Sequence, residues 1–313
     1  MVVLFAASMV LGDVDLSVLD VLRSLTARGT PGDDFIVHEL RLPRTLTGLL
    51  VGAAFGLAGG IFQTLVRNPL ASPDIIGITW GASAGAVTAI VIFGAVGSVV
   101  SLSALAGALA AAAVIYLVAW RDGVSGARLV LIGIAFAAML QALVTYLLTR
   151  AEIFTAADAL VWITGSLNGE TRSSLVSLIW GLAPVVVALL VARRWLGALH
   201  LGDESARGLG LPVERSRLAL ILIAVALTAV ATAAAGPIAF VAFVSAPIAR
   251  RLVGGPVALI ATALVGMSVV MAADLIAVHA LSTSFPVGVV TGLVGGPYLL
   301  YVLATSNRVR RNR

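Results

Sequence analysis

The chain has 313 residues, of which 60% are apolar and 11% charged, and its mean hydropathy is +1.09. Because soluble domains carry roughly a quarter charged residues, this composition indicates an all-α integral membrane protein that crosses the bilayer many times. The net charge is +5, and all twenty basic residues are arginine. Without lysine or cysteine, the chain can form no Walker A phosphate loop, Schiff base, disulfide or thiolate metal site.

The first segments predict a partial helix and then a polar loop. Residues 2–11 are apolar, but ten residues reach only about 15 Å as a helix, which is too short to cross a bilayer core. Either translation starts upstream or this first helix is truncated. Residues 12–39 are polar and acidic, and we expect a loop with short helical pieces there.

Nine longer apolar segments follow and, with the first fragment, predict about ten transmembrane helices in a single domain over residues 1–313. A polar connector at 149–174 has room for a short helix, and Gly236-Pro237 divides two runs that would otherwise merge. The predicted helices lie at 46–66, 75–95, 99–119, 129–148, 175–192, 217–235, 237–249, 257–277 and 286–304.

The arginines are distributed unevenly between the two predicted sides. Cytoplasmic loops of membrane proteins carry an excess of arginine. A cytoplasmic C-terminus places fourteen arginines inside and six outside, which favours that orientation. It predicts that Arg41 and Arg44 lie outside and that the hinge at Arg67-Asn68-Pro69 lies in the cytoplasm.

Glycines recur at every fourth residue in three predicted helices. This spacing places them near one face, where helix backbones can approach closely inside a membrane. The segment from Gly81 to Gly85 also matches the G-x-S-x-G pattern of serine hydrolases. No strand precedes it and no histidine is predicted near Ser83, so packing is favoured. We expect packing positions at Gly52, Gly56, Gly60, Gly77, Gly81, Gly85, Gly288, Gly292 and Gly296.

The largest predicted cytoplasmic loop spans about 195–217. Asp203 and Glu204 suit the first turn of a short helix, because carboxylates are stabilised at the positive end of the helix dipole. A helix of six or seven residues is marginal alone, and the chain has no other soluble part of sufficient size to order it. This loop therefore predicts a cytoplasmic partner.

Short motifs occur in a fixed order along nearly the whole chain, and the ordered set is specific although each motif alone is weak. They are R-L-P-R at 41–44, V-G-A-A at 51–54, Q-x-x-x-R-N-P-L-A-x-P at 63–73, G-x-x-x-G-A at 77–82, L-G-x-x-x-A-R-x-L-G at 201–210, G-P-I-A-F-V at 236–241, I-A-R-R-L at 248–252, A-D-L at 273–275 and F-P-V-G-V-V-T-G-L-V-G-G-P at 285–297. On these motifs the chain resembles the FecCD-type permeases of ATP-driven importers for ferric siderophores, haem and vitamin B12.

The resemblance implies the ABC type II importer permease fold in the cytoplasmic (inner) membrane of a bacterium. It also implies a complex with a second permease subunit, two cytoplasmic ATPase subunits and an extracytoplasmic substrate-binding protein, all within membrane lipid. The permease itself is then no enzyme, because its partners hydrolyse ATP, and no cofactor is expected. Three scattered histidines and the lack of cysteine argue against a metal site. Nucleic acid is not an expected partner.

The resemblance also implies roles for individual residues. Arg41 and Arg44 would dock with acidic residues of the binding protein, with an anchor at the membrane interface as the alternative. The helices at 129–148 and 286–304 resemble those that line the path. The implied cytoplasmic gate comprises Asn68, Pro69, Leu70, Ser125 and Gly126. The implied ATPase coupling site comprises Gly202, Asp203, Glu204, Ala206, Arg207 and Gly210.

The chain departs from the family pattern in two places. His279 stands where many members have an arginine, and Ala246-Pro247 stands where many have Pro-His. One outward arginine contact is therefore missing or weakly replaced by His279. Together with W-I-T-G-S-L at 162–167 and F-V-A-F at 240–243, the Ala246-Pro247 variation resembles the ferric-siderophore branch more than the vitamin B12 branch, with haem as a further alternative, and a heterodimer is favoured over a homodimer. An ion-coupled secondary transporter is the alternative from another class. It would need a mid-span carboxylate, for which Asp274 is the nearest candidate.

Overall fold

A computed structural model describes residues 1–12, 14, 16–26, 28–121, 125–255, 257–279 and 284–311, with side chains as far as residue 300. Within these ranges the chain is helical and has no strand. The elements are α1 (Val2–Val10), α2 (Val18–Leu25), α3 (Pro31–Phe35), the π-helical η1 (Ile36–Arg41), α4 (Leu42–Val66), α5 (Ile78–Phe93), α6 (Ser98–Ala119), α7 (Gly126–Arg150), α8 (Ile153–Thr164), α9 (Arg172–His200), α10 (Asp203–Gly208), α11 (Val213–Ala235), α12 (Val241–Val253), α13 (Leu259–His279) and α14 (Val287–Arg311).

The predicted all-α membrane fold is confirmed. Six described helical stretches are long and apolar enough to cross a membrane, and they are Pro31–Val66, Ser98–Ala119, Gly126–Arg150, Arg172–His200, Val213–Ala235 and Leu259–His279. Shorter apolar helices are Ile78–Phe93, Ile153–Thr164 and Val287–Leu300. Each of the ten predicted segments has a counterpart, namely α1, α4, α5, α6, α7, α9, α11, α12, α13 and α14. The helix α8 occupies the predicted polar connector.

The predicted loop at 195–217 is wrong in its extent. α9 continues to His200, past the predicted end at 192, and α11 begins at Val213, so the connection spans only 201–212 apart from α10. Arg193 and Arg194 do not end α9 because arginine is a good helix former, and both side chains are exposed. The span predicted at 237–249 also starts later than expected, because α12 begins at Val241.

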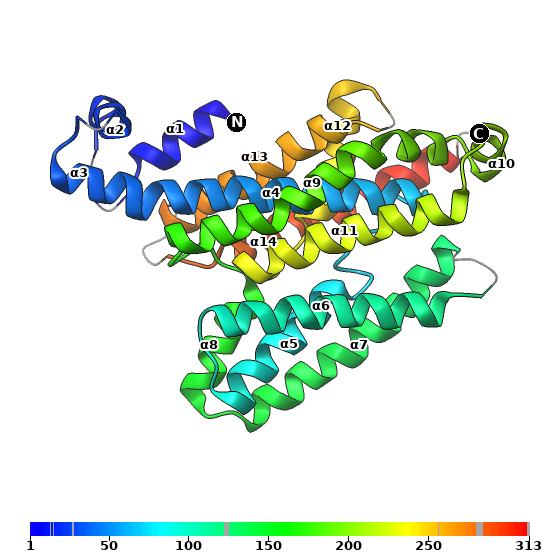
Figure 1. The fold of residues 1–313 in the computed structure, drawn as a ribbon, viewed down its shortest axis with the longest axis horizontal. Coiled ribbons are helices and arrows are strands. Elements are labelled where there is room, and N and C mark those ends of the chain that lie inside the picture. The colour runs from blue at the N-terminus through cyan, green and yellow to red at the C-terminus, as the bar shows by residue number, and fades with distance from the viewer. Residues whose placement is uncertain are drawn as a thin grey trace.

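The helix α4 is the centre of the larger group of helices. It packs against α9, α11, α12 and α13, and its buried residues lie on every side of the helix. Figure 1 shows α5 to α8 gathered below this group. It also shows α2 and α3 at the end of α4 where Arg44 lies, and α10 at the opposite end. These are termed the Arg44 end and the α10 end.

Glycines permit the closest approaches of α4 and α5 to their neighbours. A Cβ atom on Gly52 would lie 2.5 Å from the carbonyl oxygen of Gly266, and one on Gly56 would lie 2.8 Å from that of Thr262. In α5, a Cβ on Gly81 would lie 2.7 Å from the carbonyl oxygen of Gly107, and Gly85, in the same helix, meets Ser103 of α6. The backbones of α4 and α13, and of α5 and α6, are thus in direct contact.

The other predicted packing glycines differ among themselves. Gly60 approaches Thr262, and Gly288 packs directly on the carbonyl oxygen of Thr164. Gly77 precedes α5 with a φ of +90°, a conformation that favours glycine. For two α14 positions the packing role stays a prediction, because no atom of the described chain lies within 4 Å of a Cβ built there. These are Gly292 and Gly296; instead, the neighbouring Gly295 packs on Phe240.

Candidate functional site

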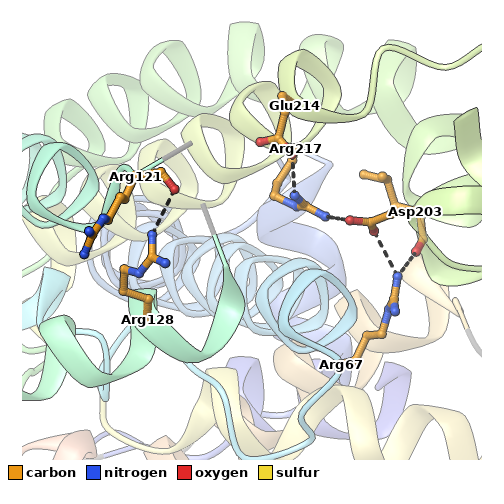
Figure 2. Close-up of polar contacts among 7 residues, drawn as sticks. Arg67, Arg121, Arg128, Asp203, Glu214 and Arg217 are labelled. Carbon is orange, nitrogen blue, oxygen red and sulfur yellow. Dashed lines mark hydrogen bonds and ion pairs between the residues drawn. The ribbon is translucent and has the colours of Figure 1, made fainter. Parts of the chain in front are cut away.

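Three helices contribute charged side chains to a cluster at the α10 end (Figure 2). Asp203 of α10 accepts hydrogen bonds from two arginines, with one carboxylate oxygen for each. Nη2 of Arg67 lies 3.0 Å from Oδ1, and Nη2 of Arg217 on α11 lies 2.7 Å from Oδ2. Arg217 also donates to Glu214 at 2.9 Å. Asp203 therefore joins the end of α4 to α11.

The short helix α10 has one buried face and one exposed face. Gly202 precedes it with a φ of +113°, and Asp203 and Glu204 occupy its first turn, as the sequence predicts. Ala206 is fully buried and anchors the helix, whereas Glu204 and Arg207 are exposed. Beyond the helix, Gly210 also has a positive φ, +79°, and is exposed.

Arg217 favours the charged form of the Asp203 carboxyl. Its hydrogen bond is the largest cause that lowers the pKa of the Asp203 carboxyl, and the charges of Arg217, Arg67 and Arg207 lower it further. Partial burial opposes this shift. Asp203 is therefore ionised at neutral pH and holds both arginines.

The helix α4 ends because Arg67 adopts a left-handed backbone conformation, with φ of 52° and ψ of 38°. Glycine is the usual residue at such a position, and a residue with a Cβ costs about 1–2 kcal/mol there. The Arg67 side chain gives a reason for arginine at this place. Besides Asp203, its Nη2 donates to the carbonyl oxygen of Leu199 at the end of α9, at 3.4 Å.

The predicted gate residues after α4 form a tight turn. Oδ1 of Asn68 accepts a hydrogen bond from the backbone N–H of Leu70 at 2.9 Å, and Pro69 lies exposed between them. The backbone N–H of Asn68 returns to the carbonyl oxygen of Gln63 at 3.2 Å. This turn begins directly at Arg67, so it is tied to the charged cluster.

The second predicted gate segment lies beside the first. The hydroxyl of Ser125 accepts from the backbone N–H of Arg128 at 3.2 Å and so caps α7. A Cβ on Gly126 would lie 3.0 Å from the Cα of Val66, the last residue of α4. Arg128 also donates to the carbonyl oxygen of Arg121 (Figure 2). The structure thus brings the two segments together, while their gating role stays a prediction.

The two arginines that the sequence predicts for docking are engaged within the chain. Arg41 is only 9% exposed and donates to the carbonyl oxygens of Met9, Val10 and Val14. Arg44 forms a two-point ion pair with Asp274, and the predicted docking role of both arginines stays a prediction. Sequence reasoning missed this pair, although an acid within an apolar helix calls for a basic partner.

A further carboxylate that sequence reasoning missed lines a cavity of about 400 Å³. Asp74 lies between the hinge and α5, and the backbone N–H of Phe240 donates to it. The cavity lies against α7 and α14, and its lining includes Gln141 and Leu299 from these helices. Asp74 is the charged member of a lining that is otherwise mainly apolar and aromatic.

The bundle of apolar helices, the charged cluster around α10 and the cavity beside α7 and α14 define a multi-pass transport permease. The chain belongs to the FecCD transport family, whose model matches residues 1–305. The predicted permease fold of an ABC importer and the placement in a membrane are thereby confirmed. Membership of this family implies ATPase and permease partner subunits.

Individual relatives cover nearly the whole chain. The ferric enterobactin transport system permease protein FepG of Escherichia coli is 44% identical over 303 residues, which are 95% of this chain and 91% of that protein. The iron(3+)-hydroxamate import system permease protein FhuG of Bacillus subtilis is 38% identical and covers 98% and 94%. A metal-chelate type ABC transporter in an inward-facing conformation matches with a TM-score of 0.87 and 27% identity, over 97% of this chain and 96% of that one.

Proposed function

We propose that the chain is the transmembrane permease subunit of an ATP-driven importer, which moves an iron(III)-siderophore complex across the cytoplasmic membrane into the cell. The observation that carries this proposal is the match of 97% of the chain to a metal-chelate type ABC transporter. The names of the relatives FepG and FhuG support the iron(III) chelate as cargo. The iron travels inside its chelator, so the permease needs no metal ligands of its own.

The chain acts passively in this proposal. One of the two ATPase subunits of the complex binds the exposed face of α10 from the cytoplasm, at the coupling residues Glu204 and Arg207. Movement of the ATPase subunits opens and closes the gate at residues 68–70 and 125–126. The cargo then passes along the face of α7 and α14, where the cavity with Asp74 lies. The C-terminus lies in the cytoplasm, on the same side as α10, which fits the excess of arginine there.

An extracytoplasmic substrate-binding protein delivers the cargo at the Arg44 end. Arg44 is the better candidate of the two docking arginines, because a quarter of its side chain remains exposed whereas Arg41 is held by backbone carbonyls. A carboxylate of the partner would share Arg44 with Asp274. This arrangement suits a contact that forms and releases in each cycle.

A second permease subunit completes the path. Support comes from α14, where a Cβ built on Gly292 or Gly296 would meet no described atom within 4 Å and Leu293 is 72% exposed. Small residues next to an exposed apolar face allow another helix to approach closely. We favour a related but non-identical subunit over a second copy, on the family features in the sequence.

Two other functions remain as alternatives. A permease for haem or vitamin B12 would have the same fold and a different cargo. An ion-coupled secondary transporter would use a carboxylate in the membrane, and Asp274 does not suit that role because it is held by Arg44. Asp74 would be its remaining candidate.

The proposal is tested with tagged chain that is purified from its host membrane. We expect ATPase subunits and a second permease to co-purify, and ATP hydrolysis to rise when the binding protein carries an iron(III)-siderophore. Parallel assays use ferric hydroxamate, ferric catecholate, haem and cobalamin on their binding proteins. A chain that purifies without ATPase subunits would overturn the proposal. If only haem or cobalamin stimulated ATP hydrolysis, that compound would be the cargo in place of the iron(III)-siderophore.

A further inference from the structure

We propose that Arg67 is a positioning residue that couples α10 to the cytoplasmic gate through its ion pair with Asp203. This inference rests on the proposed function, since it takes the ATPase to bind α10 and the gate to lie at residues 68–70. It adds a residue to the transport cycle that the sequence motifs do not assign to coupling. It also changes the role of Asp203 from an ATPase contact to an internal link.

Arg67 connects α4 directly to the gate turn. It is the last residue before the Asn68 turn and the first after α4, so its backbone belongs to both. The turn is closed by the hydrogen bonds Asn68 N–H to Gln63 and Leu70 N–H to Asn68. A movement of the Arg67 side chain therefore acts directly on a hydrogen-bonded turn.

The Arg67 side chain connects the end of α4 to α10 and α9. The backbone of α10 packs on α9 and α11, the two helices that flank it in the chain. The side chain of Arg67 spans from α4 to this unit, with Nη2 at 3.0 Å from Asp203 and 3.4 Å from the carbonyl oxygen of Leu199. Figure 2 shows Asp203 between Arg67 and Arg217. A shift of α10 thus reaches the hinge through Arg67.

The helix α10 has one face that contacts the permease and one exposed face. Asp203 and the buried Ala206 serve the permease, because the carboxylate is used by Arg67 and Arg217. The exposed residues Glu204 and Arg207 remain for a partner, together with Leu209, which is 69% exposed. The helix can therefore hold an ATPase on one face and the gate on the other.

The Arg67–Asp203 pair is partly exposed. The Arg67 side chain is 52% exposed and that of Asp203 is 35% exposed. Ion pairs with this exposure contribute little to folding stability. Arginine also stands where the backbone favours glycine. The pair thus fits a role in positioning better than a role in stability.

The experiment compares Arg67→Gly with Arg67→Lys in the reconstituted complex of permease, ATPase subunits and substrate-binding protein. Glycine suits the left-handed backbone and removes the side chain, whereas lysine keeps the charge. Three quantities are measured: ATPase subunits bound, ATP hydrolysed, and chelate imported per ATP. For Arg67→Gly we expect normal assembly and hydrolysis, with import per ATP reduced by at least about fivefold, the lower range of measured coupling factors.

The matched controls separate the possible outcomes. Arg67→Lys should recover most of the import, and Arg193→Ala, at an exposed arginine of α9, should import as the unmodified complex does. Unchanged import in Arg67→Gly would overturn the inference, and so would equal loss of ATPase binding and import, because Arg67 would then serve assembly. An unmodified complex that assembles no ATPase subunits would overturn the proposed function itself.

Discussion

The guanidinium of Arg44 on α4 donates two hydrogen bonds to the carboxylate of Asp274 on α13, at 2.7 Å and 3.0 Å. The Asp274 side chain is only 5% exposed, and that of Arg44 is 25% exposed. The pair lies in the same helix contact in which Gly52 meets Gly266. α4 and α13 are therefore joined by close backbone packing and by a buried ion pair.

Removal of Arg44 should destabilise the chain strongly. Arg44→Ala leaves the Asp274 carboxylate buried without its partner, and breaking a buried pair in this way costs about 3–5 kcal/mol. The double variant Arg44→Ala with Asp274→Ala should recover part of that loss, because no buried charge remains. Thermal unfolding of the purified chain measures both effects. Equal Tm values for Arg44→Ala and the unmodified chain would contradict this account of the pair.

Exchange of the two residues separates docking from folding. Arg44→Asp with Asp274→Arg keeps an ion pair between α4 and α13 but moves the positive charge to the other helix. We expect the folded chain to bind its ATPase subunits normally and its substrate-binding protein about tenfold more weakly, or about 1.4 kcal/mol. Surface-immobilised binding protein gives the affinity. Unchanged affinity would show that the charge at Arg44 serves α13 alone.

The glycines of α4 and α14 should respond differently to a methyl group. Gly52→Ala forces the backbones of α4 and α13 apart, and overpacking of this kind costs about 1–3 kcal/mol. The added methyl group of Gly292→Ala meets no atom of the described residues within 4 Å, so the stability of the chain should be unchanged or slightly higher, since alanine favours helix. Chemical unfolding of the isolated chain compares them. A larger loss for Gly292→Ala would contradict the assigned helix contacts.

The contribution of Asp203 to folding stability should depend on pH. Its folded pKa lies below the usual value of 3.8, because of the Arg217 hydrogen bond and the neighbouring arginines. A lowered carboxyl pKa stabilises the folded state above the unfolded pKa, and this contribution is lost as pH falls through the folded pKa. Asp203→Asn should therefore be less stable than the unmodified chain at neutral pH, and the difference should close in acid below 3.8. A difference that grows in acid would be evidence against the ion pairs.

The long apolar helices could be predicted from the sequence, because apolar length and hydropathy are properties of each segment alone. The start of α10 was predictable for the same reason, from Asp203 and Glu204 beside glycine. The end of α9 could not be predicted from its arginines, since the helix continues through Arg193 and Arg194. Arginine is compatible with helix, so its charge marks a membrane boundary better than a helix end.

The partners within the candidate site could not be predicted. Arg44 and Asp274 are 230 residues apart in the chain, and Arg67 and Asp203 are 136 apart. One sequence gives the charges but not which of them meet, because that depends on how α4 packs among its neighbours. The helix that meets Gly292 and Gly296 could not be predicted for a related reason. Their spacing shows a face suited to contact, and within the described chain no helix covers it.

The most direct test of the account is uptake of an iron(III)-siderophore into vesicles that contain the reconstituted complex, with its loaded substrate-binding protein on the outside. ATP enclosed in the vesicles and an imposed proton gradient are supplied separately. We predict uptake with ATP and none with the proton gradient alone. Uptake that follows the proton gradient and ignores ATP would contradict the assignment as an importer permease.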